Sequence, residues 1–285
     1  MPDLLTIAAD ASVDLQLHTV YSDGTWTPEA LIEALIEGGF ALAAITDHDR
    51  PDTAPVLRQL SQEKQFPLIT ATEMTTNWRG EMTDVLCFGF DPDSRLLSEI
   101  AQDVLRRQQD NIREVYQQLV RDGYRFENQS SDPLEQILAQ PASHQPHALV
   151  DLLKANGIGT PERSAGRILL DAGVQFAMSE IGAVVDATHK SGGVCLLAHP
   201  GRGGEFPLYT PELIEEMRAE IPIDGLEVYY PLHSEAQTAE FKAYAEIHQL
   251  LISAGSDSHG PEMMPIRYPA GNIRRLLERL GIQVL

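Results

Sequence analysis

The sequence has little positive charge, and this shortage limits what the protein can bind. Its 285 residues include 21 Lys and Arg against 42 Asp and Glu, which gives a formal net charge of −21. Binding of duplex nucleic acid depends on a surplus of Lys and Arg, so a protein that mainly grips nucleic acid is disfavoured and no stable nucleic-acid partner is expected. Anionic substrates held through metal ions remain compatible with this charge.

Cysteines and long apolar runs are also scarce. Cys87 and Cys195 are the two cysteines, and each stands in an apolar stretch, which favours buried free thiols over a disulfide or a cysteine metal site. No apolar segment approaches the roughly 18 residues of a membrane span. The first ten residues lack the basic region and the long apolar run of a secretory signal. We therefore expect a cytoplasmic protein with no membrane partner.

Short apolar runs alternate with longer segments of helical periodicity, a pattern typical of an α/β fold whose parallel strands are joined by crossover helices. In the first unit, strand 13–19 precedes a helix that begins with Thr27 as N-cap and Pro28, and that stops at Gly38-Gly39. Seven strands are predicted in this way, near 13–19, 40–49, 67–74, 83–90, 192–200, 225–230 and 250–260.

The alternation fails in the middle of the chain. A long helical pattern follows Leu96, and a segment rich in Ser, Asp, Pro and Gln and two short helix-like pieces follow it. We therefore predict that 96–176 is a mostly helical insertion, packed on the barrel and without a core of its own, and that 1–95 and 177–285 form the barrel.

Imidazoles and carboxylates stand at the ends of one predicted strand after another. In a (β/α) barrel, active sites assemble at the carboxyl ends of the strands, so residues distant in sequence become neighbours there. Mixed imidazole and carboxylate ligands suit divalent transition metals, and a carboxylate can bridge two ions. The polar residues at these strand ends, which are the candidate ligands of a multinuclear metal site, are Gln16, His18, Asp23, Asp47, His48, Asp49, Glu73, Asp84, His199, Asp257 and His259. Hydrogen-bonded or surface roles are the simpler interpretation for His144, His189 and His248.

The motifs that carry these residues resemble the PHP (polymerase and histidinol phosphatase) superfamily. They are DLQLHTVYSDGTWTPEALIEAL, AITDHD, ITATEMTT, DVLCFGFDP, LLAHPGR, GLEVYYPLHS and AGSDSHG, in the order of the family. The resemblance implies a distorted (β/α)7 barrel, an α/β fold, that binds two to three divalent metal ions. It is strongest to stand-alone phosphoesterases that carry a helical insertion and act on nucleoside phosphates or RNA 5′ ends.

Two positions depart from the ligand pattern that this resemblance implies. Gln16 stands where the family has the first His of a His-x-His pair, and Asp84 replaces another His. The first site would use His18, Glu73 and Asp257, the second Glu73, Asp84 and His199, and the third Asp23, His48 and His259. Replacing imidazole by oxygen ligands favours Mn²⁺ or Mg²⁺, with Zn²⁺ or Fe²⁺ as the alternatives, and leaves the first site weak or empty.

Three further residues are predicted near the substrate. The resemblance makes His147 a candidate catalytic residue, as a substrate contact or as the proton donor to the leaving group, with a surface role as the alternative. Gln145 replaces an Arg of the relatives. Arg202 is a candidate for binding a substrate phosphate through its planar guanidinium, and His233 occupies a recurrent family position at the rim.

The combined prediction is a metal-dependent phosphoric ester hydrolase. It would hydrolyse a small phosphomonoester, preferably a nucleotide, by attack of a metal-bound hydroxide. Two alternatives remain open. One is a 5′-3′ exoribonuclease or oligonucleotide phosphodiesterase of the same superfamily, assisted by a basic patch of Arg106, Arg107 and Arg113. The other is a non-catalytic regulatory barrel whose metal site has been degraded at Gln16.

Overall fold

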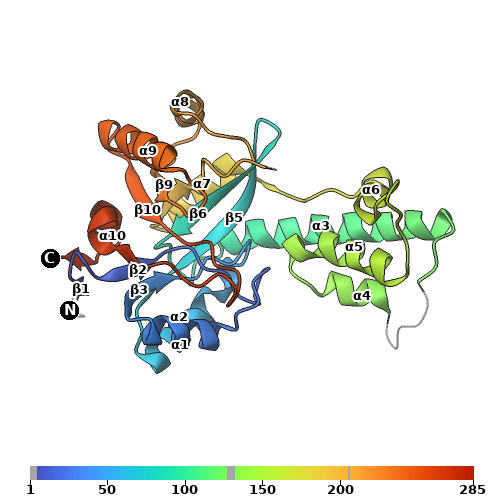
Figure 1. Ribbon diagram of the computed structural model, residues 1–285, viewed down its shortest axis with the longest axis horizontal. Helices are drawn as coiled ribbons and strands as arrows, with labels where there is room; N and C mark the ends of the chain where they lie inside the picture. The colour runs from blue at the N-terminus through green and yellow to red at the C-terminus, as the bar shows by residue number, and fades with distance from the viewer. Residues whose placement is uncertain (1–4, 127–131, 205) are drawn as a thin grey trace. The chain divides into compact units, whose positions relative to one another are not determined.

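The computed structural model describes residues 5–126, 132–204 and 206–285. The chain divides into two compact units, one formed by Met1–Ile100 with Ser179–Leu285 and the other by Ala101–Met178 (Figure 1). Among the described residues, no helix combines the length and the apolar character needed to cross a membrane.

The described strands all lie in the first unit and form three hydrogen-bonded sheets. Their orders are β10-β9-β8-β6-β5-β7, β11-β2-β3-β4 and β1-β12. The bounds are β1 Thr6–Ile7, β2 Ser12–Asp14, β3 Phe40–Ala44, β4 Leu68–Ile69, β5 Ala71–Trp78, β6 Glu81–Phe88, β7 Ser179–Glu180, β8 Val194–Leu197, β9 Gly225–Tyr229, β10 Leu251–Ala254, β11 Tyr268–Pro269 and β12 Gln283–Val284. The predicted α/β class is confirmed, with parallel pairing of β2 with β3, β3 with β4, β8 with β9 and β9 with β10.

One strand runs against the predicted parallel order. β6 pairs antiparallel with β5 and with β8. The cause is local: β5 and β6 are joined by a tight turn at Arg79 and Gly80, both with positive φ, and a connection this short can join only antiparallel strands. The start of β6 therefore lies beside the carboxyl end of β8, where the amide of Ala198 donates to the carbonyl of Asp84.

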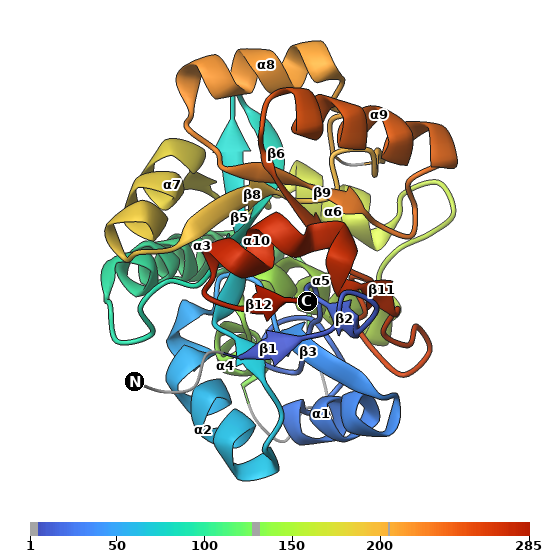
Figure 2. The same ribbon diagram turned by 90° about the vertical axis from the view of Figure 1, so that its left-hand side faces the viewer.

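The helices of the first unit pack against these sheets. α1 and α2 contact each other and lie against β3 and β4, and α8 and α9 contact each other next to β9 (Figure 2). Their bounds, with three short 3-10 helices labelled η, are α1 Pro28–Glu37, η1 Pro51–Thr53, α2 Ala54–Lys64, α7 Ile181–Lys190, α8 Pro211–Glu220, α9 Glu235–Ile247, η3 Ala270–Ile273 and α10 Arg274–Arg279, and η2 belongs to the second unit.

Helix α1 shows how closely local sequence fixes these elements. The side chain of Thr27 accepts a hydrogen bond from the amide of Ala30, Pro28 occupies the first turn, and the helix ends at Gly38. These features confirm the predicted start and stop. The buried face of α1 consists of Pro28, Leu31, Ile32 and Leu35.

The second unit is helical and has an apolar core of its own. α3 (Leu96–Arg121) runs from the first unit into the second, and α4 (Pro133–Leu138), η2 (Ala142–His144), α5 (Gln145–Ala155) and α6 (Ala165–Asp171) follow it. Their apolar faces form one cluster around Ile112, Leu119, Leu149, Leu153 and Leu169. The expectation that this segment lacks a core is therefore wrong, because four amphipathic helices bury enough apolar surface among themselves.

Candidate metal centre

The site begins where β2 leaves its sheet. The carboxylate of Asp14 accepts hydrogen bonds from the amides of Ser256 and Ile266, each at 2.9 Å. The amide of His18 donates to the carbonyl of Ser258 at 2.9 Å. These bonds hold the segment after β2 against the segment after β10, which is why His18 and Asp257 meet although they are distant in sequence.

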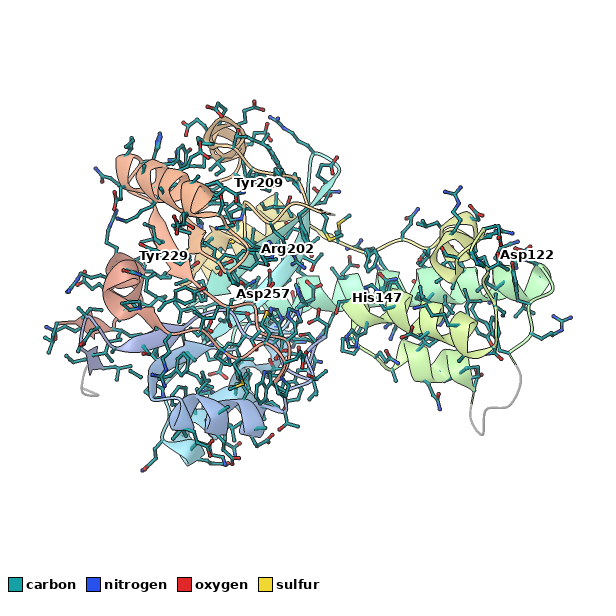
Figure 3. The ribbon with its side chains drawn as sticks, viewed as in Figure 1. Asp122, His147, Arg202, Tyr209, Tyr229 and Asp257 are labelled. Atoms are coloured by element: carbon teal, nitrogen blue, oxygen red, sulfur yellow. The ribbon has the colours of Figure 1, made fainter. Side chains whose placement is uncertain are left out.

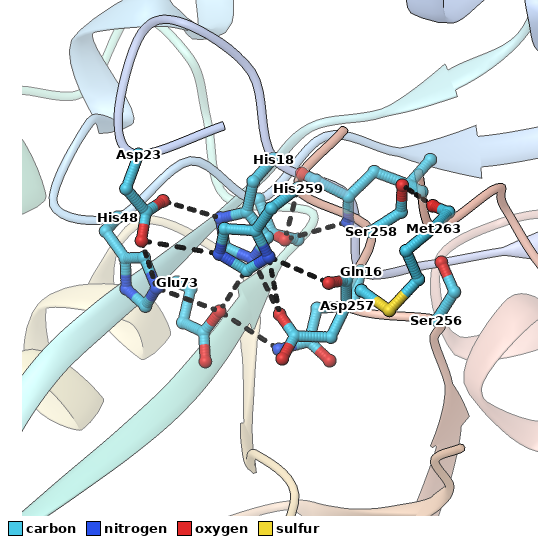
Figure 4. Close-up of polar contacts among 12 residues, drawn as sticks. Gln16, His18, Asp23, His48, Glu73, Ser256, Asp257, Ser258, His259 and Met263 are labelled. Carbon is cyan, nitrogen blue, oxygen red and sulfur yellow. Dashed lines mark hydrogen bonds and ion pairs between the residues drawn. The ribbon is translucent and has the colours of Figure 1, made fainter. Parts of the chain in front are cut away.

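Glu73 lies at the middle of the polar cluster (Figure 4). Its Oε2 atom is 3.1 Å from His18 Nε2, and its Oε1 atom is 3.0 Å from His199 Nε2. Asp257 Oδ1 is also 3.1 Å from His18 Nε2. Glu73 and His18 have no exposed surface. One buried carboxylate thus turns one oxygen towards each of two imidazoles.

A second part of the cluster surrounds Asp23. Its Oδ1 atom lies 3.6 Å from His18 Nδ1, and its Oδ2 atom lies 3.8 Å from His48 Nε2 and 3.3 Å from His259 Nε2. The rings of His18 and His259 stack with centroids 4.1 Å apart. Figure 4 shows these side chains facing one another.

Asp84 and His199 complete the arrangement on the other side of Glu73. His199 Nε2 is 3.8 Å from Asp84 Oδ2, and Asp84 reaches this place because β6 is antiparallel. His199 and Asp257 both have positive φ, of 27° and 57°, which side chains other than Gly rarely adopt. Strained backbone at two of the predicted ligands is typical of a functional site.

The charges within the cluster shift the pKa values of its side chains. Burial opposes ionisation of Glu73, but the imidazoles of His48 and His18 outweigh it and hold the pKa of the Glu73 carboxyl well below its usual value. Burial also lowers the pKa of His48, but the charges of Glu73 and Asp23 outweigh it and raise that pKa to about 9. Burial and then the charge of Glu73 raise the pKa of Asp84 to about 6. Carboxylates this close together repel one another unless cations lie between them.

The donor set fits divalent metal ions. Both ring nitrogens of His18 and one oxygen of Asp84 are buried without a hydrogen-bond partner, a costly state for atoms that are not ligands. No Lys or Arg is buried among the described residues, so the buried positive charge of the cluster comes from imidazoles, and the exposed Arg202 lies 3.6 Å from Asp257. Three sets of ligand atoms lie close enough to hold an ion: His18, Asp23, His48 and His259; His18, Glu73 and Asp257; and His48, Glu73 and Asp84.

All eight predicted metal ligands therefore come together in the first unit, with two differences in grouping. His18 also joins the set of Asp23, His48 and His259. Asp84 and Glu73 form a set with His48, whereas the resemblance assigned them His199. His199 remains 3.0 Å from Glu73. The carboxylate of Asp84 stays 3.8 Å from His199 Nε2, which is beyond hydrogen-bond distance.

The two predicted substrate residues of the first unit, Arg202 and His233, differ in their surroundings. Arg202 is partly exposed, and its Nη1 atom lies 3.6 Å from Asp257 Oδ2 (Figure 3). Its guanidinium lies over the Phe206 ring, 4.8 Å from the ring centroid. His233 is buried, and both of its ring nitrogens face backbone groups: Nε2 accepts from the Gly201 amide, and Nδ1 is 3.0 Å from the Val228 carbonyl. A substrate contact of His233 stays a prediction, and its observed bonds brace the loop after β8.

Two residues of the insertion carried predictions. His147 lies on α5 in the second unit, where its ring is 5.6 Å from that of Phe176. Its catalytic role stays a prediction. Gln145 is fully buried and donates to the carbonyls of Gln140 and Leu138, so it closes the turn between α4 and α5.

Sequence reasoning assigned no supporting role to two buried acids that hold the segments of the predicted ligands. Asp47 accepts three hydrogen bonds, from the amide and hydroxyl of Thr19 and from the hydroxyl of Ser22, and so orders the loop that carries Asp23. Glu227 accepts from the amide of His199 at 3.0 Å, and burial raises its pKa well above the usual value. Asp47 comes shortly after β3 and Glu227 lies inside β9, and a buried acid at either place is the signal that could have revealed its role.

The chain is similar over most of its length to known phosphoesterases. It is 28% identical over 250 residues to the 5′-3′ exoribonuclease Rnm of Escherichia coli (strain K12), covering 87% of this chain and 85% of that protein. It is 27% identical over 263 residues to the 3′,5′-nucleoside bisphosphate phosphatase of Chromobacterium violaceum, covering 88% of each. A solved structure of a candidate metal-dependent phosphoesterase from Bifidobacterium adolescentis has a TM-score of 0.73 and 25% identity over 98% of both chains. No family model matches the chain.

Proposed function

We propose that this chain, a metal-dependent phosphoesterase of the PHP type, hydrolyses small phosphomonoesters and prefers nucleotides. The observation that carries the proposal is the convergence of buried imidazoles and carboxylates on Glu73, beside a partly exposed Arg202. A cluster that is rich in carboxylates and has no buried Lys or Arg suits an anionic substrate only when divalent ions lie between them.

The proposed cofactors are two to three divalent ions, with Mn²⁺ or Mg²⁺ favoured because oxygen ligands are numerous. Such ions polarise a phosphoryl group, stabilise charge on the leaving oxygen and lower the pKa of bound water. Glu73 is suited to bridge two of them, since its oxygens face His18 and His199 separately. The chain supplies the rest by fixing these side chains on strand ends.

Arg202 is the proposed phosphate contact. Its guanidinium is held by stacking on Phe206 and lies next to the ligand Asp257, so a phosphoryl group at the metal centre would meet its N–H groups. A planar guanidinium donates two parallel hydrogen bonds to phosphate oxygens, which fixes orientation as well as charge. The side chain of Gln145 donates to a backbone carbonyl of the insertion, so it does not replace the Arg of the relatives as a phosphate contact.

The finer architecture that we propose is a distorted (β/α)7 barrel. Support comes from two isolated bridges that join the separate sheets, Leu17 with Ser258 and His48 with Glu73. In addition, the amide of Leu15 donates to the carbonyl of Ala254. The proposed barrel uses β2, β3, β4 continued by β5, β6, β8, β9 and β10. Its closure would bring every predicted ligand to one rim.

Oligonucleotide hydrolysis is the second candidate function, and the similarity of the chain to an exoribonuclease favours this candidate. The proposed electrostatic assistance is weak, however. Arg106 and Arg107 pair with Asp103, and Arg113 pairs with Asp110, so the predicted basic patch is neutralised on its own helix. Turnover of a 5′-phosphorylated oligonucleotide should fall steeply with salt if such a patch acts, and turnover of a mononucleotide should change little.

The experiment that tests the proposal is phosphate release from nucleoside monophosphates, nucleoside bisphosphates and 5′-phosphorylated oligonucleotides with added Mn²⁺. The natural chain is compared with Glu73→Ala. We expect the natural chain to release phosphate fastest from mononucleotides and the variant to release none above background. If the natural chain binds Mn²⁺ but hydrolyses nothing in the panel, the regulatory-barrel alternative is favoured instead.

A further inference from the structure

Gln16 is built into the wall of the metal centre. Its side chain is fully buried. Gly255 lies directly against it, because a Cβ atom at 255 would come 2.3 Å from the Cβ atom of Gln16. A glycine at this position is therefore what lets the Gln16 side chain occupy its place.

The two polar atoms of the Gln16 amide differ in their hydrogen bonding. Nε2 donates a hydrogen bond to Glu73 Oε2 at 3.0 Å. Oε1 is buried and has no hydrogen-bond partner. A buried carbonyl without a hydrogen-bond donor is unfavourable, so this end of the amide is energetically unsatisfied.

The oxygen that Gln16 contacts is shared with a candidate metal position. Glu73 Oε2 is also 3.1 Å from His18 Nε2, which is 3.1 Å from Asp257 Oδ1. These three residues form one of the sets that could hold an ion. The N–H groups of an amide carry partial positive charge and offer no lone pair, so they compete with a cation for the same carboxylate oxygen.

We propose that the amide of Gln16 weakens metal binding at this first position, so that the metal ions bind to the centre in two stages. The two other positions fill first, at low free Mn²⁺. The first position fills only at higher free Mn²⁺, when the amide of Gln16 turns and presents its unpaired Oε1 in place of its N–H groups. The inference rests on the proposed function, since it assumes that these residues hold divalent ions.

The test is an equilibrium titration of metal-free protein with Mn²⁺, in which free Mn²⁺ is measured by electron paramagnetic resonance. We expect the natural chain to bind two ions tightly and a third about 10-fold to 100-fold more weakly. In Gln16→His an imidazole lone pair replaces the amide, and all three ions should bind tightly. Gln16→Glu should show the same gain, which guards against a misfolded histidine variant.

A matched control adds a histidine elsewhere. Gln117 is exposed on α3 in the second unit, and Gln117→His introduces the same side chain away from Glu73. It should titrate like the natural chain, so a gain there would attribute the extra ion to surface binding and overturn the inference. Identical stoichiometry and affinities in the natural chain and in both Gln16 variants would also overturn it. That result, together with phosphate release by the natural chain, leaves the proposed function standing; absence of any Mn²⁺ binding removes both.

Discussion

The two units of the chain bury different kinds of side chain. Residues 101–178 contain 8 of the 21 basic residues and 10 of the 42 acidic residues, so the net charge of −21 falls almost entirely on the first unit. In the second unit, the buried polar side chains among the described residues are Gln108 and Gln145, which bond to backbone groups. The first unit buries Asp, Glu and His side chains instead. The buried amides of the second unit bond to its backbone, whereas the buried acids and imidazoles of the first unit include groups that could hold a metal ion.

The free energy of burial makes this difference informative. A buried charge is costly unless it is paired, and paired charges usually include Lys or Arg. Around Glu73 the partners are imidazoles, and neighbouring carboxylates such as Asp84 keep a raised pKa. Stability of the first unit should therefore depend on pH and on metal, and stability of the second unit should not.

The largest effect is expected from Glu73→Gln, which removes the negative charge that faces the imidazoles of His18 and His199. Phosphate release should fall by about 1,000-fold or more, because the substitution removes a ligand at the centre of the charge-stabilising cluster. Steady-state kinetics with Mn²⁺ measures this loss. Glu114→Gln makes the same chemical change at an exposed position of α3 and should leave the rate unchanged. Equal rates for the natural chain and Glu73→Gln would contradict a catalytic role for the buried acids of the first unit.

The pH dependence of stability should come from the first unit. The folded-state pKa of His48 is about 9, above its ordinary value of 6.5, so its contribution is fully present below pH 6.5 and is lost as pH rises through 9. His48 alone should lower the free energy of unfolding of metal-free protein by about 3 kcal/mol over this range. Urea unfolding in EDTA at several pH values measures it, and His48→Gln should flatten the slope. Saturating Mn²⁺ should oppose the slope, because metal binds the deprotonated imidazole.

His147→Ala asks whether the insertion takes part in the chemistry. If His147 gives a proton to the leaving group, kcat should fall by about 100-fold while Mn²⁺ stoichiometry stays unchanged. His144→Ala is the matched control, because both residues line the same cavity of about 420 Å³ between α4 and α5. Loss of activity in neither variant would restrict the second unit to a structural role.

The smallest effect is expected from Arg202→Gln. Loss of a charge-assisted hydrogen bond to phosphate should raise KM by about tenfold with a smaller change in kcat. Arg113→Gln is the control, since Arg113 already pairs with Asp110 at 3.0 Å in the second unit. An unchanged KM in Arg202→Gln would assign phosphate binding to other groups.

The convergence of the predicted ligands could be expected from the sequence because strand ends are local signals. His18, Glu73 and His199 each follow an apolar run, and the topology of an α/β fold brings such ends together. The helix start at Thr27 was equally visible in the sequence. The antiparallel course of β6 was hidden, because the apolar run of β6 reads the same in either direction and only the turn at Gly80 fixes it.

Long-range polar bonds could not be predicted. Asp14 is paired with the amide of Ile266, and Asp47 with Thr19, over separations that no periodicity reveals. The core of the second unit was missed for a related reason. Its helices are short after α3, and their apolar faces meet only in three dimensions.

The most direct test of the metal centre is an anomalous difference map from crystals grown with Mn²⁺. Strong peaks are expected in contact with Glu73, and the weakest of them at the position bounded by His18 and Asp257 beside Gln16. Absence of any peak at Glu73, in crystals whose soaking solution saturates the protein with Mn²⁺, would contradict the account.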